Sequence, residues 1–141
     1  MMSTYLFYAK LYALTVPVFF AIDMVWLGVV ARTFYRSRLA SLLRTDVNWP
    51  AAFAFYFIYI AGILLFAVVP NLNHGSLGRC VLWGALFGFF TYATYDLTNL
   101  ATVKDWPLSV TIVDILWGVV LCSAVSASSY GIGRWLGYAP V

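Results

Sequence analysis

Charged residues are rare in this sequence, and glutamate is absent altogether. Lysine, arginine and aspartate together make up 9% of the 141 residues, whereas 64% are hydrophobic. Soluble domains carry about 25% charged residues, so this chain has too little polar surface to cover a water-exposed globule. The composition therefore predicts an integral membrane protein, and nothing in it indicates nucleic-acid binding.

Histidine and cysteine are also scarce, which leaves little material for a metal or nucleophilic site. His74 is the only histidine, and it lies in a polar stretch apart from any nucleophile. Cys80 and Cys122 have neither metal-ligand nor redox spacing, and we expect them to be small apolar fillers. The sequence assigns no metal ligands and identifies no cofactor.

Long apolar runs dominate what is present, and a membrane-spanning helix needs about 20 such residues. Four stretches qualify, at roughly residues 8–30, 50–69, 79–101 and 107–129. Pro17 lies inside the first and is expected to kink it, and residues 71–78 are expected to form a polar turn. The linkers leave no room for a second domain. We predict an all-α fold, with residues 1–141 forming one transmembrane four-helix bundle.

The linker between the first two stretches is rich in arginine. Its apolar residues recur at helical spacing, with arginines on the remaining surface. We predict a short amphipathic helix in the membrane interface. The arginines either meet lipid phosphates and fix the topology, or one of them reaches an anionic substrate. The apolar residues are Tyr35, Leu39, Leu42 and Leu43, and the basic ones are Arg32, Arg36, Arg38 and Arg44.

The linker charges also predict an orientation. Those four arginines and Lys104 lie at one face, against Lys10, Arg79 and Arg134 at the other. Cytoplasmic linkers carry the excess of lysine and arginine. The first and third linkers are therefore expected in the cytoplasm, with both termini outside.

Three of the five aspartates lie inside apolar stretches, where a charge is costly. A helix rises about 1.5 Å per residue, so depth follows from distance along the chain. By this measure Asp23, Asp96, Asp114 and Tyr56 all lie about 7–11 Å from the same face. The sequence therefore predicts one buried layer of acids and tyrosines.

The third stretch also places its polar and small residues on one side. Helical i, i+3 and i+4 steps join Gly84, Gly88, Tyr92, Tyr95, Asp96 and Asn99. A small-xxx-small pair lets a neighbouring helix approach closely, and we assign this pair to packing within the chain.

The first and fourth stretches carry similar segments, "AIDMVWLGVV" and "IVDILWGVVL", each with Asp-x-x-Trp. This spacing places Trp26 and Trp117 beside their own aspartates, to which each indole N–H could be donated. Tyr-x-x-Tyr recurs in the second and third stretches, at Tyr56/Tyr59 and Tyr92/Tyr95.

Three ionised carboxylates in one apolar layer, without a basic residue at that depth, are implausible. Either protons are shared with the tyrosines, or a cation, metal or cationic ligand completes the site, or an arginine of the first linker folds inward. A network of neutral acids with a structural role alone is the remaining alternative.

The first functional hypothesis is a site that binds or transforms a lipophilic small molecule among the membrane lipids. Asp96 would be the central acid or base, with Asp23 and Asp114 beside it. The expected ligand-binding residues are Tyr92, Tyr95, Asn99, Tyr56, Tyr59, Trp26 and Trp117.

Two other active functions compete with it. One is a proton- or cation-coupled transporter, which with four helices needs a parallel homodimer. The other is a divalent-metal enzyme acting on phosphorylated lipid, with oxygen ligands from the three aspartates and Asn99.

The segments "DMVWLG", "ARTFYR", "GALFGFFTYATYDLTNLAT" and "WPLSVTIVDILWG" resemble the bacterial membrane proteins of domain-of-unknown-function family 2177. The resemblance covers nearly the whole chain. It implies a small bacterial inner-membrane protein with four helices, and it supplies no activity and no catalytic residues.

Overall fold

The computed structural model describes residues 3–138, which form four long helices and one short one without any β-strand. The first long helix is α1 (Thr4–Val25) continued by the π-helical turn η1 (Trp26–Val30), and the second runs through α3 (Trp49–Ile63), η2 (Leu64–Val68) and α4 (Val69–His74). The others are α5 (Leu77–Thr102) and α6 (Leu108–Trp135), and the short helix is α2 (Arg32–Arg38). The predicted all-α fold is confirmed.

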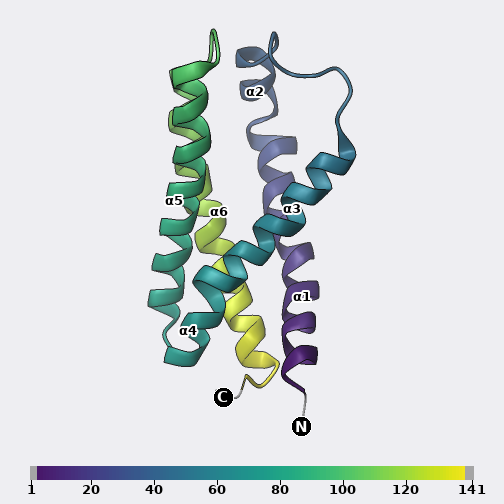
Figure 1. The fold of residues 1–141 in the computed structure, drawn as a ribbon, viewed down its shortest axis with the longest axis vertical. Helices are drawn as coiled ribbons and strands as arrows, with labels where there is room; N and C mark the ends of the chain where they lie inside the picture. The colour runs from purple at the N-terminus through teal and green to yellow at the C-terminus, as the bar shows by residue number, and fades with distance from the viewer. Residues whose placement is uncertain (1–2, 139–141) are drawn as a thin grey trace.

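The long helices run alternately up and down the molecule (Figure 1). The start of α1 and the end of α6 lie at one end, and α2 lies at the other end with the turn that joins α5 to α6. α3 crosses the bundle obliquely, so that its first turns diverge from α5.

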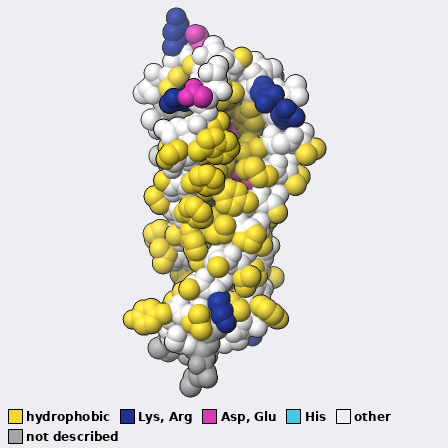
Figure 2. All heavy atoms as spheres, turned by 90° about the vertical axis from the view of Figure 1, so that its right-hand side faces the viewer, with side chains coloured by type: hydrophobic (Ala, Val, Ile, Leu, Met, Phe, Trp, Pro, Cys, Tyr) yellow, Lys and Arg dark blue, Asp and Glu magenta, His cyan; other side chains and the backbone are white. Residues whose placement is uncertain are grey.

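The surface and the helix lengths are those of a multi-pass membrane protein. Three helices are long and apolar enough to cross a bilayer, namely Thr4–Val30, Trp49–His74 and Leu108–Trp135. Hydrophobic side chains cover the middle of the face in Figure 2, and basic side chains gather toward its two ends. α5 is of similar length but carries more polar residues and is not among the three.

The second long helix differs from its predicted end. We expected it to stop at residue 69 and residues 71–78 to form a turn, but the helix continues to His74. In η2 the Val69 N–H bonds to the carbonyl of Leu64, five residues back. This wider turn accommodates Pro70, which has no N–H and whose ring would crowd a regular helix. Gly75, at φ 65°, then ends the helix in the left-handed conformation.

The amphipathic helix after η1 is present but shorter than its apolar pattern. α2 ends at Arg38, and Leu39 follows it as a buried C-cap residue. Leu42 and Leu43 lie beyond the helix and are exposed.

The closest helix packing joins α5 to α6. A Cβ atom added to Gly88 would lie 2.0 Å from the backbone oxygen of Gly118, and one added to Gly84 would lie 2.3 Å from Oγ of Ser126. Only glycine permits backbones to approach so closely. The predicted role of Gly84 and Gly88 in packing within the chain is confirmed.

Candidate functional site

Asp23 lies at the centre of a junction between three helices. It comes from the last turns of α1 and is 5% exposed. The indole Nε1 of Trp117 on α6 donates to Oδ1 at 3.3 Å, and the hydroxyl of Tyr56 on α3 donates to Oδ2 at 3.2 Å. Each carboxylate oxygen thus has a neutral donor. This confirms that Tyr56 and Asp23 lie at the same depth.

Asp114, near the start of α6, accepts a hydrogen bond from a residue outside the four long helices. The hydroxyl of Tyr35 on α2 donates to its Oδ1, and the same hydroxyl accepts a bond from Nε1 of Trp26 at 3.2 Å. Burial, reinforced by the bond to Asp114, raises the pKa of Tyr35. Its phenol therefore remains a donor at neutral pH. Sequence reasoning placed Tyr35 on the amphipathic helix but missed its role in the acid layer.

Each tryptophan of the Asp-x-x-Trp segments donates toward the other helix, and not to the aspartate of its own helix as expected. Trp117 donates to Asp23 rather than to Asp114, and Trp26 reaches Asp114 only through Tyr35. Their rings stack with centroids 4.4 Å apart and an interplanar angle of 6°. The aspartate and tryptophan of each segment lie on the same face of their helix and point toward the other helix. Each indole therefore lies nearer the carboxyl of the other helix than the carboxyl of its own.

Asp96 is completely buried on α5. Neither of its oxygens accepts a hydrogen bond from a donor within residues 3–138. The carboxyl of Asp114 on α6 is close enough to act on it electrostatically. Two neighbouring carboxyl groups in an apolar layer oppose each other's ionisation. The predicted layer is therefore divided into a neighbouring Asp96–Asp114 pair and a separately bonded Asp23.

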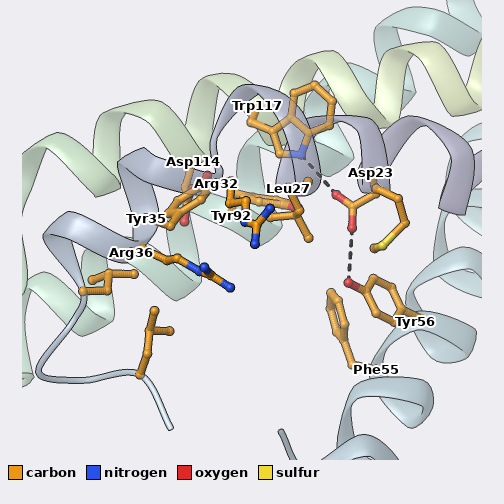
Figure 3. Close-up of a pocket in the computed structure, with 14 residues that line it drawn as sticks. Asp23, Leu27, Arg32, Tyr35, Arg36, Phe55, Tyr56, Tyr92, Asp114 and Trp117 are labelled. Carbon is orange, nitrogen blue, oxygen red and sulfur yellow. Dashed lines mark hydrogen bonds between the residues drawn. The ribbon is translucent and has the colours of Figure 1, made fainter. Parts of the chain in front are cut away.

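A cavity of about 600 Å³ opens beside these groups, and we call it the acidic cavity. Asp23 and Asp114 lie on its wall with their tyrosine and tryptophan donors, and α2 contributes two arginines (Figure 3). The rest of its lining is mostly apolar or aromatic. The lining residues are Asp23, Met24, Leu27, Gly28, Arg32, Tyr35, Arg36, Leu39, Leu43, Phe55, Tyr56, Tyr92, Asp114 and Trp117.

A second cavity, of about 510 Å³, adjoins the first. Phe55, Tyr92 and Asp114 line both, so these three residues form the partition between them. Its other lining residues are Tyr59, Thr91 and Tyr95. Asp114 is thus the one acid that faces both cavities.

Of the expected ligand-binding residues, Tyr59, Tyr95 and Asn99 do not line the acidic cavity. The Tyr59 hydroxyl forms hydrogen bonds with Oγ1 of Thr91 at 2.8 Å and with Sγ of Cys122 at 3.2 Å. Cys122, which was expected to be a small apolar filler, therefore also has a polar contact. Tyr95 is 59% exposed and packs edge-on against a tryptophan. Asn99 is half-buried and lines neither cavity.

No group of three or more histidine, cysteine, aspartate or glutamate side chains in the described part of the chain could hold a metal ion. One sequence hypothesis held that an arginine of the first linker folds inward to complete the acid site. Arg32 and Arg36 line the acidic cavity. Neither is paired with an aspartate, since Arg44–Asp46 is the only ion pair among residues 3–138.

No curated protein and no solved structure matches this chain. One protein family does, and its description is "Predicted membrane protein (DUF2177)". The match extends over residues 8–131, which include all three aspartates of the acid layer. The chain therefore belongs to this family of membrane proteins, as the sequence resemblance indicated.

Proposed function

We propose that the protein binds, and acts on, a lipophilic small molecule in the acidic cavity. The observation that carries this proposal is a cavity of about 600 Å³ that combines apolar walls with two hydrogen-bonded aspartates. Ligand pockets in proteins have volumes of about 300–1,000 Å³, apolar walls and a few fixed polar groups. Ionisable residues inside a membrane protein are functional candidates by default.

The contacts distinguish the roles of the three aspartates. Asp114 lines the acidic cavity and Asp96 does not, so we place Asp114, rather than Asp96, against the ligand. Asp23 already accepts a bond at each oxygen and acts as a positioning residue for Trp117 and Tyr56. Tyr92 completes the aromatic wall beside Asp114.

Filling the cavity should displace the ligand without harming the fold. Gly28 lines the acidic cavity, and a Cβ atom added there meets no atom within 4 Å. We expect native mass spectrometry to show a lipophilic adduct on the wild-type protein and its loss from Gly28→Phe, whose ring takes the ligand's place.

The matched control for this experiment is Gly131→Phe on α6. Gly131 has equally open surroundings but does not line the acidic cavity. This variant should keep the adduct. A wild-type protein that carries no adduct, or a Gly28→Phe variant that retains it, would contradict the proposal.

The Asp96–Asp114 pair favours a second candidate, a proton-coupled carrier that works as a parallel homodimer. Because two neighbouring carboxyls oppose each other's ionisation, one of them would bind a proton that ligand binding could release. A pH gradient across proteoliposomes should then drive proton flux through the wild-type protein but not through Asp96→Asn. Equal flux through both, or none through either, would remove this candidate.

We further propose that α5 is a fourth crossing, in a bacterial inner membrane. α5 packs along α6, antiparallel to it, through the glycine contacts described above. It therefore shares the depth of a helix that is apolar enough to span. The excess of basic residues in the first and third linkers supports a cytoplasmic side for α2 and the α5–α6 turn, with both termini outside.

Single-cysteine labelling should reveal this orientation, because native Cys80 and Cys122 are both buried. An impermeant maleimide added to intact spheroplasts should label His74→Cys and leave Ser37→Cys unlabelled, since they lie at opposite ends of the bundle. Lysis should expose both positions. The reverse labelling pattern would invert the topology, and labelling of both in intact cells would show that the helices do not separate them.

A further inference from the structure

Two arginines in the acidic cavity have no partner for their charge. Arg32 and Arg36 are four residues apart and hence on one face of α2. Within residues 3–138, their neighbours Arg38 and Arg44 each bond to a side chain, whereas these two guanidinium groups do not. Figure 3 shows both extending into the cavity, between the Tyr35 side and the Tyr56 side.

The aspartates of the same cavity do not neutralise these arginines. Asp23 accepts its bonds from Trp117 and Tyr56, and Asp114 accepts from Tyr35. All three donors are neutral, and no arginine bonds to either carboxyl. Two cationic groups therefore remain available at the α2 end of the cavity, where an anion would find bidentate donors.

The cavity has a basic part and a mostly apolar part. Arg32 and Arg36 come from α2, beyond the first span candidate, whereas Met24, Leu27 and Phe55 belong to the span candidates Thr4–Val30 and Trp49–His74. Phe55 is 50% exposed on α3. An amphiphile in a membrane has the same order, with its charge at the interface and its chain toward the centre.

We propose that the acidic cavity takes an anionic amphiphile, whose phosphate or carboxylate head group lies on Arg32 and Arg36 and whose chain lies along Leu27 and Phe55. This inference rests on the proposed function and narrows its ligand class. It also gives Asp114 a target, because that carboxyl lines the same cavity as the two arginines.

Photo-crosslinking of single-chain probes tests the head-group class. The protein is placed in nanodiscs of phosphatidylcholine with diazirine-bearing hexadecyl phosphate, hexadecanoate or hexadecanol, which share a chain and differ in charge. We expect at least one of the anionic probes to label Met24, Leu27 or Phe55 about tenfold more than the alcohol does, because only the anion gains charge-assisted bonds. Inorganic phosphate should leave this labelling unchanged, since it lacks the chain.

Two variants test whether the preference for anionic probes comes from Arg32 and Arg36. Arg32→Gln/Arg36→Gln should reduce anionic labelling to the level of hexadecanol, whereas Arg44→Gln, outside the cavity and paired with Asp46, should not. Equal loss in both variants would indicate general surface charge and overturn the inference. The comparison of probes on the wild-type protein does not depend on how any variant folds.

The outcomes separate this inference from the proposed function. Equal labelling of the cavity by hexadecanol would overturn the anionic class and leave a lipophilic ligand standing. Abolition of labelling by inorganic phosphate would mean that the site takes a free anion, which would overturn the amphiphile. If no probe labels the cavity, both the inference and the proposed function fail.

Discussion

Replacing Gly88 with alanine is expected to force α5 away from α6 and to lower the free energy of unfolding by about 3 kcal/mol. The added Cβ would lie 2.0 Å from the Gly118 oxygen and 2.6 Å from the Gly118 carbonyl carbon. Both atoms belong to the backbone, so no rotamer change can relieve the clash and one helix must move. Unfolding in mixed micelles of increasing denaturing-detergent content measures the effect.

Gly131→Ala is the control, because it adds the same methyl group to the interior of α6. Nothing lies within 4 Å of the added atom there. Alanine favours the helix over glycine, so this variant should be unchanged or more stable by about 0.5–1 kcal/mol. Equal destabilisation by the two substitutions would show that the α5–α6 glycine contact is not what makes Gly88 sensitive.

The depth of the acid layer was predictable because a helix has a fixed rise and the helices alternate in direction. Counting residues from the ends of the apolar stretches placed Asp23 and Tyr56 at one level, and the structure joins them by a hydrogen bond. The same periodicity identified the side of α5 that carries Gly84, Gly88 and Asp96. These predictions needed only distances along single helices.

The partners across helices were not predictable by the same means. Periodicity gives the face of a helix but not its rotation against a neighbour, so it could not show that Trp117 serves Asp23 or that Tyr35 reaches Asp114. The continuation through Pro70 was missed because a π-helical turn is set by backbone packing, which leaves no simple residue pattern. An inward-folding arginine of the first linker was one alternative, but only the structure shows that Arg32 and Arg36 line the cavity without side-chain partners.

The same substitution at two buried aspartates should change stability in opposite directions. Asp23→Asn is expected to lower the free energy of unfolding by about 2 kcal/mol, because the carboxylate's charge-assisted bonds are lost and one amide hydrogen is left without an acceptor. Asp96→Asn is expected to raise it by about 1 kcal/mol, because it replaces a buried carboxyl that accepts no hydrogen bond from the described residues by a neutral amide and removes its repulsion with Asp114. Both changes preserve side-chain size, and the mixed-micelle unfolding used for Gly88 measures them.

The direction of the stability change in Asp96→Asn distinguishes a functional role of Asp96 from a purely structural one. A carboxyl that has no protein donor and yet is kept in the centre of the bundle lowers stability, and groups of that kind are characteristic of sites retained for activity. If Asp96→Asn instead destabilises the protein as much as Asp23→Asn does, Asp96 has a structural role. The proton-coupled carrier would then lose the carboxyl pair on which that candidate depends.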